Sequence, residues 1–571
     1  MAGPPQRRLT TSPPRDRRAA RSAKRRTSMH TRPNAAVTFP LCPCTRPPGE
    51  PRPAVPPGDV AMSSEGTPKA PLRAVLLIFY AVVACLHAGR SVAEQPRQPP
   101  NLLVIMTDEH NFRTLGCYRK LLPPEQAFMW GKAVVDTPNI DWLADRGAVC
   151  TSFYAVTPVC SPSRAAFVSG LYPHHTGVVT NNIPLRDGVV TFAEILRRHG
   201  YATGYAGKWH LDGPGKPQWA PQRKFGFVDN RFMFNRGHWK KLELTPDGPR
   251  VAARRKGKPT YALDGADEKT FTTDFLTDRT IEFLRAHANE PFCFMLSIPD
   301  PHGPDTVRPP YDTMFAHMTF RPPRSAIAPV AELPSWGKRE SKNFDQSKYY
   351  GMVKCIDDNV GRILAALREL KLLSRTIVVF TSDHGDLRGE HGRQNKGVPY
   401  EASARVPFVL YDAAHVRPGT VIDQVLTSVD FLPTVVDLMD VPVPHAVHGR
   451  NAAALFRSGK PPADWVDVGF LRSTGSKPGW LAAVTDRYKL VLSANDPPWL
   501  FDLQTDPDEL INFRDNPECR GVLRQLATHL FEYTRRFEDP FAKHPGIAHD
   551  LRWAMSDAER YEPRPRRTGE R

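Results

Sequence analysis

The sequence predicts an α/β protein with a large, mixed, mostly parallel sheet sandwiched by helices and a smaller C-terminal α+β subdomain. Segments with strand-like and helix-like patterns alternate from about residue 95. Two expected strands, 101–106 and 376–380, are continuous apolar runs, which is typical of strands buried on both faces. From about residue 440, proline and glycine separate shorter segments, which indicates a second unit.

The remaining elements are predicted from periodicity and from end signals. The clearest helix, 349–372, repeats apolar residues at three- and four-residue steps and therefore has one buried face. Glycines end the short helices expected over 141–146 and 191–199. The other predicted elements are strands at 149–154, 201–206, 292–298, 481–485 and 490–493, and helices at 273–288 and 521–537.

The length of 571 residues suits one large and one small domain. We predict an N-terminal catalytic domain over 95–440, a C-terminal subdomain with a small antiparallel sheet over 441–545, and a polar tail over 546–571. Residues 214–270 are rich in glycine, proline, tryptophan and basic residues without clear periodicity. They are expected to form an irregular insertion at the rim of the site, where the tryptophans either pack the loop or offer platforms for sugars.

The formal net charge of +17 is concentrated at the N-terminus. Residues 1–61 hold twelve Lys or Arg against three Asp or Glu, together with many prolines. This segment is predicted to be a disordered leader, or to lie upstream of the true start at Met62. The charge therefore gives no reason to expect a nucleic-acid partner.

Residues 62–94 are typical of a secretory signal, with a basic lead, an apolar run over 74–86 and a small-residue cleavage site. The run of about 13 residues is short for a membrane span, although an anchor is the alternative. The signal predicts export, so the protein is expected to be periplasmic or secreted. Val82-Val83-Ala84-Cys85 also resembles a lipobox, which makes a lipid anchor at Cys85 a further alternative.

Cysteines after the signal are widely spaced and show no zinc-type clustering, so their pairing is left open. These cysteines are Cys117, Cys150, Cys160, Cys293, Cys355 and Cys519. Cys293 and Cys355 lie in apolar segments and are expected to be buried core thiols.

Cys160 directly precedes a predicted helix start, with Pro162 in the first turn and Gly170 at the end. This places a sulfur atom at the positive end of a helix, beside the guanidinium of Arg164, where the local potential favours a thiolate. For a lone cysteine, the alternative is a half-buried residue on an ordinary strand–helix turn.

Acidic residues follow two of the predicted buried strands. Asp108 and Glu109 come after the first strand, and Asp383 and His384 follow the strand at 376–380. Functional groups collect beyond the carboxyl ends of parallel strands, so we expect these pairs to meet Cys160 at one edge of the sheet. Hard oxygen ligands of this kind favour Ca²⁺ or Mg²⁺. A single Asp after a strand would more often be a cap, but two such pairs favour a metal site.

The string Cys160-Ser161-Pro162-Ser163-Arg164 resembles the signature of the type I sulfatases. Other similar blocks, in the family's order, are 100–108, 137–141, 207–210, 301–302, 381–385, Lys396 with 400–401 and 405–407, 430–434 and 500–503. The match covers essentially all of 100–515 and implies an alkaline-phosphatase-like fold. The pair Asp383-His384 is most similar to iduronate-sulfatase-like members.

The resemblance implies that a maturation enzyme oxidises Cys160 to formylglycine. The modified residue, Asp108, Asp383 and His384 would bind Ca²⁺, with Mg²⁺ the less favoured ion. Glu109 departs from the family pattern, which has Asp or Gln at this position. As a metal ligand, its longer side chain would reach the ion either directly or through a water molecule. Catalytic roles near the aldehyde hydrate, the sulfate or the leaving oxygen are implied for Arg164, Lys208, His210, His302 and Lys396.

The implied reaction is hydrolysis of a sulfate ester of a carbohydrate or an aryl alcohol. Attack on sulfur adds negative charge to an anion, which a divalent ion, Arg164, Lys208 and Lys396 would offset. His302 would protonate the leaving oxygen, and His210 would accept a proton from the hydrate. The alternatives are a phosphate or phosphonate ester hydrolase of the same superfamily, and a non-catalytic binder of anionic glycans.

Overall fold

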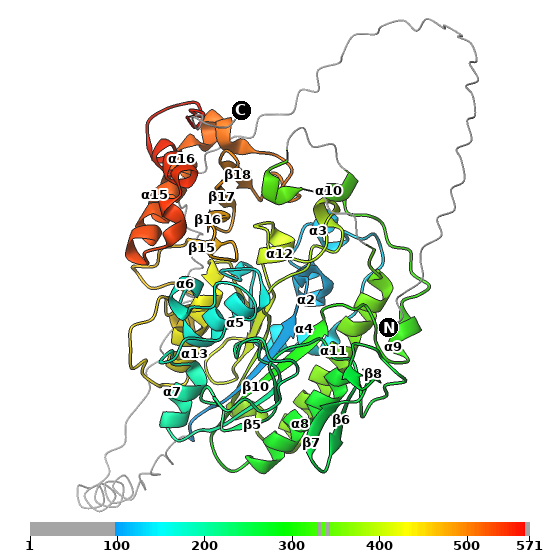
Figure 1. Ribbon diagram of the computed structural model, residues 1–571. Coiled ribbons are helices and arrows are strands. Elements are labelled where there is room, and N and C mark those ends of the chain that lie inside the picture. Colours follow the sequence, from blue (N-terminus) through cyan, green and yellow to red (C-terminus); the bar gives the residue numbers. More distant parts are fainter. Residues whose placement is uncertain (1–97, 328–332, 339–342, 566–571) are drawn as a thin grey trace, which may run out of the picture. The chain divides into compact units, whose positions relative to one another are not determined.

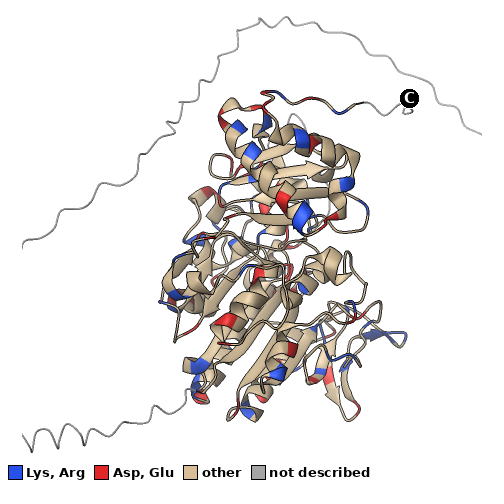
Figure 2. Cartoon of the chain, turned by 90° about the vertical axis from the view of Figure 1, so that its left-hand side faces the viewer, with Lys and Arg blue, Asp and Glu red and all other residues tan. Residues whose placement is uncertain are grey.

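The computed structural model describes residues 98–327, 333–338 and 343–565. The predicted leader over 1–61 and the predicted signal over 62–94, including Cys85, lie outside these ranges. Within the described ranges, the structure has no helix that is both long enough and apolar enough to cross a bilayer. Figure 2 shows basic and acidic residues interspersed over the described elements.

An eight-stranded mixed sheet forms the centre of the main domain, in the order β13-β2-β12-β11-β1-β10-β4-β5 (Figure 1). The strands are β1 Asn101–Asp108, β2 Ala148–Cys150, β4 Ala202–Lys208, β5 Asp229–Phe234, β10 Phe292–Pro301, β11 Thr376–Ser382, β12 Phe408–Tyr411 and β13 Thr420–Ile422. Only β12 runs antiparallel to its two neighbours; the other five pairs of neighbouring strands are parallel. The predicted mixed, mostly parallel sheet is confirmed.

Alternate side chains of β1 enter two separate hydrophobic cores. Leu102 and Val104 belong to one core, whereas Leu103 and Ile105 belong to the other. Helices α5 Cys160–Ser169, α7 Phe192–Arg198 and α13 Phe431–Leu438 cover the first face, and α4 Pro138–Arg146, α8 Thr272–Ala286 and α11 Gln346–Glu369 cover the second (Figure 1). The central strands are therefore buried on both sides, as their continuous apolar sequences predict.

Short elements connect these layers. They are the helices α2 Gly116–Arg119, α3 Pro124–Ala127, α6 Pro173–Thr176, α9 Tyr311–Met314, α10 Arg324–Ile327, α12 Glu401–Ala404 and α14 Ala453–Ser458, and the paired strands β3 Phe153–Tyr154 and β14 Leu426–Thr427. The six cysteines of the described ranges are buried, and both Cys293 and Cys355 lie in the core as predicted.

The C-terminal subdomain contains a four-stranded antiparallel sheet of β15 Gly469–Arg472, β16 Trp480–Val484, β17 Tyr488–Ser493 and β18 Trp499–Asp502. Two helices, α15 Arg520–Arg536 and α16 Pro545–Met555, share its core. The predicted polar tail from residue 546 is therefore wrong at its start. Ile547, Leu551 and Ala554 of α16 are buried, because their spacing of four and three residues places them on one face of the helix.

The insertion at 214–270 is more regular than predicted. Its strand β5 joins the edge of the main sheet, and two hairpins follow, β6 Leu242–Thr245 with β7 Gly248–Val251 and β8 Arg254–Arg255 with β9 Lys258–Pro259. Trp239 is 2% exposed, so it packs the loop and offers no platform for a sugar.

Candidate active site

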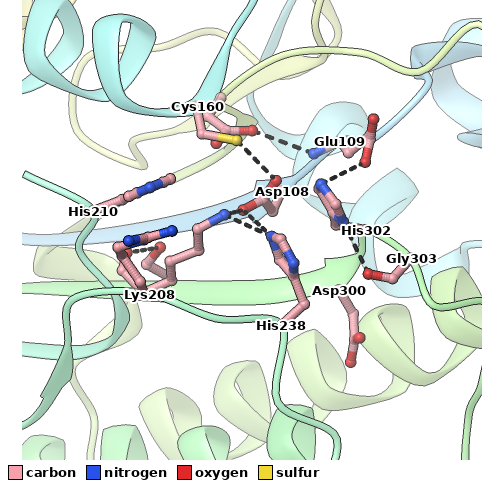
Figure 3. A network of polar contacts seen from close by, with 12 residues as sticks. Asp108, Glu109, Cys160, Lys208, His210, His238, Asp300, His302 and Gly303 are labelled. Carbon is pink, nitrogen blue, oxygen red and sulfur yellow. Dashed lines mark hydrogen bonds and ion pairs between the residues drawn. The ribbon is translucent and has the colours of Figure 1, made fainter. Parts of the chain in front are cut away.

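The carboxyl ends of four neighbouring strands, β11, β1, β10 and β4, bring the predicted residues together. Asp108 and Glu109 end or follow β1, Asp383 follows β11, and Lys208 ends β4. The Glu109 amide donates to Asp383 Oδ1 over 3.2 Å, so a hydrogen bond ties the β1 and β11 loops together. Figure 3 shows the side chains of Asp108 and Lys208 beside Cys160.

Cys160 is the first residue of α5, after an extended Val159, so the helix starts one residue earlier than predicted. Its side chain is buried, with Sγ 3.2 Å from His384 Nε2 and 3.9 Å from Asp108 Oδ1. Burial and Asp108 raise the pKa of the thiol, but Lys208, Lys396 and His384 together hold this pKa well below its usual value. The position at the helix N-terminus and the surrounding cations thus favour an anionic atom at residue 160.

Four potential metal ligands meet at this point. Donor atoms of Asp108, Cys160, Asp383 and His384 all lie within 4.8 Å of one another, and all four residues are buried. Two carboxylates and an imidazole form a donor set that suits a divalent cation, and the carboxylate oxygens favour Ca²⁺ or Mg²⁺. The donor set therefore fits the predicted metal site, without distinguishing between the two ions.

Arg164 holds this ligand group in place. Its guanidinium donates to Asp383 Oδ2 over 2.8 Å and to Asp108 Oδ2 over 3.2 Å. It also donates to the Lys208 carbonyl and to Ser297 Oγ. Because one buried side chain contacts groups from β1, β4, β10 and β11, Arg164 orients the carboxylates. Its predicted contact with a hydrate at position 160 stays a prediction.

Glu109 is the predicted ligand that the structure does not place with the other four. Its backbone has φ 64°, and the side chain turns away toward His302 and Lys396. Glu109 Oε1 lies 2.9 Å from Lys396 Nζ, and Oε2 lies 2.9 Å from His302 Nε2. Burial raises the pKa of Glu109, but His302 and Lys396 lower it further, so the carboxylate is ionised. It contacts two catalytic candidates and is not among the four clustered donors, and its role as a metal ligand stays a prediction.

His238 is a site residue that the sequence did not single out. Its Nε2 lies 2.8 Å from Lys208 Nζ, and its ring stacks on His302 with centroids 3.5 Å apart. Asp108, His238 and His302 form a second group of potential metal ligands. The Lys208 ammonium, however, contacts both Asp108 Oδ2, over 2.5 Å, and His238 Nε2. The positive charge of Lys208 therefore already occupies the place that a metal ion would take in this second group.

A cavity of about 190 Å³ opens over Cys160. It is lined by Cys160, Asn181, Asn182, Lys208, His210, Lys216, Arg236, Gly237, His238, Tyr261, His302 and Lys396. None of these lining residues, all from the described ranges, is acidic. Two larger cavities, of about 850 and 970 Å³, are lined by other residues. The small cavity is therefore suited to an anionic group that reaches position 160.

His210 lies in this cavity with a buried Nδ1 that has no hydrogen-bond partner within the described ranges. Its Nε2 is 3.2 Å from Asn182 Oδ1. Burial lowers the pKa of His210 to about 4, so the imidazole is neutral near pH 7 and its free nitrogen can accept a proton.

A comparison with protein families identifies the chain. The family model described as Sulfatase matches residues 100–441. The protein belongs to the sulfatase family. A second model, described as N-sulphoglucosamine sulphohydrolase, C-terminal, matches residues 389–536 of this sulfatase. As a member of the family, it is a sulfuric ester hydrolase. The closer resemblance to iduronate-sulfatase-like members stays a prediction.

Curated relatives resemble this sulfatase along most of their length. It is 27% identical to the ulvan-active sulfatase of Formosa agariphila, over 82% of this chain and 87% of that protein. It is 24% identical to the N-acetylglucosamine-6-O-sulfatase of Bacteroides thetaiotaomicron, over 81% of this chain and 91% of that protein.

Solved structures show the same fold. One, a complex with its substrate D-glucosamine-2-N,6-O-disulfate, has a TM-score of 0.65 at 22% identity and covers 78% of this sulfatase and 100% of that chain. The phosphonate monoester hydrolase of Silicibacter pomeroyi has a TM-score of 0.59 at 23% identity, with 78% and 97% covered. Because the fold carries both activities, the chemistry must be argued from the site itself.

Proposed function

We propose that this sulfatase hydrolyses a sulfate ester of a carbohydrate, with a formylglycine made from Cys160 as the nucleophilic residue and Ca²⁺ as the ion. The observation that carries the proposal is the convergence of Cys160, at the start of α5, with Asp108, Asp383 and His384 beneath a cavity lined by cations. The relatives named for ulvan and N-acetylglucosamine-6-O-sulfate chemistry support a carbohydrate substrate.

The cavity lining suits the binding of a sulfate ester. Lys208 and Lys396 are each fixed by a carboxylate, Asp108 and Glu109 respectively, so their ammonium groups are oriented before substrate arrives. Oriented cations stabilise charge that develops on the sulfuryl oxygens without having to reorganise. The stacked rings of His238 and His302 line the same cavity beside the two lysines.

The ion and the modified residue would supply the rest of the chemistry. Asp108, Asp383, His384 and residue 160 would hold a divalent ion, which would supply positive charge beside the sulfuryl group. An aldehyde hydrate at 160 would supply one hydroxyl for attack on sulfur and a second whose deprotonation would allow sulfate to leave. The residues of the chain would move the protons, one for each half of the reaction.

His302 is the candidate acid for the leaving oxygen. Its Nδ1 donates to the Gly303 carbonyl over 2.9 Å, which leaves Nε2 between Glu109 Oε2 and Lys396 Nζ, at 2.9 and 2.8 Å. Glu109 Oε2 is placed to accept a hydrogen bond from Nε2, and the cavity gives that nitrogen access to substrate. On the other side, the unpartnered Nδ1 of His210 is the candidate acceptor for the proton of the hydrate.

The burial of Cys160 bears on its maturation. The residue is 3% exposed, beneath a cavity of about 190 Å³, so a modifying enzyme has no route to it in the folded protein. We therefore propose that a formylglycine-generating enzyme acts on the unfolded chain, during export through the segment at 62–94. Lipid attachment at Cys85 and simple cleavage are distinguished by mass spectrometry of the mature N-terminus.

The test combines chemistry at residue 160 with turnover. Peptide mass spectrometry should find an aldehyde at position 160 in active protein, and the protein should release sulfate from aryl sulfates and sugar sulfates. Chelation should abolish the release, and Ca²⁺ should restore it better than Mg²⁺. An unmodified Cys160 in fully active protein contradicts the mechanism. Faster turnover of phosphonate or phosphate monoesters than of sulfate esters contradicts the proposed substrate class.

A further inference from the structure

Two basic residues at the cavity have no acidic partner. Lys208 and Lys396 are each paired with a carboxylate, but Lys216 and Arg236, which line the same cavity, form no ion pair with any described residue. The Lys216 ammonium lies 4.6 Å from the ring centroid of Tyr261 and 5.5 Å from that of Trp239. Arg236 Nη1 donates only to the Pro214 carbonyl, over 2.8 Å.

The backbone fixes these two residues relative to each other. Asn235, which is fully buried, donates from its side chain to the carbonyls of Gly213 and Gly215, over 2.9 and 3.1 Å. Its amide donates to the Pro217 carbonyl over 2.8 Å. The segment carrying Lys216 is therefore bonded to the residue next to Arg236.

The same framework fixes both residues relative to the reacting centre. Strand β5 pairs in parallel with β4, and Phe234 lies opposite Lys208. Gly237 adopts φ 123° where a Cβ atom would lie 2.3 Å from the Trp239 ring, so the turn that places His238 in the site needs glycine. Hydrogen bonds and strand pairing thus hold the backbone of Lys216 and Arg236 in place beside the site.

The charges of the cavity exceed what one sulfate ester requires. A sulfate monoester carries one negative charge, and the residues around Cys160 already provide fixed donors for it. The unpaired ammonium and guanidinium are arranged in a cavity without acidic residues, where charge-assisted hydrogen bonds are strong. They are complementary to one further anionic group.

We propose that Lys216 and Arg236 form a second anion subsite, which binds a carboxylate or a second sulfate on the same sugar. The inference rests on the proposed function and sharpens it, because it makes the preferred substrate a sugar with two anionic groups. The subsite lies in the insertion, so it selects the substrate without taking part in the attack on sulfur.

Binding to the Cys160→Ala variant tests the subsite without turnover. Three ligands are compared at fixed ionic strength: a neutral hexose monosulfate, the same hexose with a second sulfate, and a sulfated hexuronic acid. At least one of the two dianions should bind about tenfold more tightly than the monosulfate. Which of them does so identifies the second group as sulfate or carboxylate. Adding Lys216→Gln and Arg236→Gln should abolish this preference, and Lys216→Arg should keep it.

Lys224→Gln is the matched control. Lys224 is an exposed lysine of the same insertion that donates to the Val228 carbonyl over 3.1 Å and does not line the cavity. Its replacement removes the same charge and should leave the ratio of the affinities unchanged. A similar loss of the ratio in this variant would show a general electrostatic field and overturn the subsite.

Turnover by the enzyme with an unsubstituted Cys160 separates the subsite from the proposed function. With the subsite intact, KM for the preferred dianion should be lower than for the monosulfate, and Lys216→Gln with Arg236→Gln should raise it about tenfold with a smaller change in kcat. Equal affinities for all three ligands overturn the subsite, even if sulfate is released. Absence of sulfate release from every ligand overturns the proposed function, while the binding ratio still decides the subsite.

Discussion

Two buried charge clusters in this sulfatase use the same kinds of group for different ends. In the active site, Lys208 and Lys396 line a cavity, and each is paired behind it with a carboxylate, Asp108 and Glu109 respectively. In the second cluster, Lys489 of β17 contacts Glu401 and Glu509 over 2.7 and 2.9 Å and donates to the Pro399 carbonyl over 2.7 Å. We call this second group the Lys489 cluster. It joins the C-terminal sheet to α12 of the main domain.

The difference lies in what the charged atoms face. The Lys489 ammonium is fully buried, and it is held by two hydrogen bonds, to the Pro399 carbonyl and to Glu509, and by the ion pair with Glu401. The active-site lysines face a space that a substrate can enter. Both clusters shift pKa values: burial raises the pKa of Glu509 to about 7, whereas Lys208 and its neighbours hold that of Asp108 well below its usual value. Burial and a shifted pKa therefore do not mark a functional site unless a cavity accompanies them.

The strongest test of the active-site half of the comparison is Cys160→Ala. Removing the atom that becomes the nucleophile should lower kcat by more than about 10⁴-fold, with little change in thermal stability. Release of sulfate from a sugar sulfate measures the loss. Cys150→Ala, at a buried free thiol in β2, is the matched control and should keep kcat for the folded protein. Retained activity in Cys160→Ala would exclude the proposed nucleophile.

The same substitution at the two lysines should give opposite results. Lys396→Met should lower kcat about 10²- to 10³-fold, because an oriented cation is lost at the transition state. Lys489→Met should lower the free energy of unfolding by about 3–5 kcal/mol, because it leaves two buried carboxylates without their partner. Kinetics and urea unfolding on both variants check the contrast. The comparison fails if Lys489→Met lowers kcat of the folded enzyme while its stability is unchanged.

Glu390, beside the Lys489 cluster, should make stability depend on pH. Its carboxylate accepts from Arg113 over 3.0 Å, and burial raises its pKa to about 7. Between about pH 4.5 and 7 the folded state holds a proton that the unfolded chain has lost, so stability falls as pH rises through this window, by about 1–3 kcal/mol. Glu390→Gln should reduce this fall in urea unfolding at pH 5 and 8. An identical fall in both proteins would contradict the assignment.

His238 gives the smallest expected effect. His238→Phe keeps a ring to stack on His302 but loses the 2.8 Å contact with Lys208 Nζ. Losing a hydrogen bond to a charged group should lower kcat/KM about tenfold. His238→Asn, which offers an acceptor without the stacked ring, distinguishes the two roles. Equal activity of His238→Phe and the unsubstituted enzyme would show that Asp108 alone positions Lys208.

The sequence predicted those parts of the site that follow from sheet topology. Asp108 and Asp383 were found because parallel strands end at a common edge, and Cys160 because its helix has a clear start and stop. The start of α11 lies three residues earlier than predicted, since Asp345 caps the helix by accepting from the Lys348 amide.

His238 and α16 were missed for physical reasons. His238 follows β5, a six-residue edge strand with exposed and half-buried positions that give no strong alternation, and its contact with Lys208 depends on a β4–β5 pairing that the pattern does not specify. In α16 only a few apolar residues are buried amid charged ones, so tertiary packing against α15 and the C-terminal sheet decides the helix.

The parallel pairing of β4 with β5 separates two tasks along the chain. Reaction groups sit on strands and loops of the inner sheet, while residues 214–261 project from its outermost strand. A designer who keeps His238, which contacts Lys208, can therefore treat the rest of this outer stretch as an exchangeable cassette: grafting another one onto the same edge strand would retarget the enzyme to a different sugar and leave its chemical centre intact.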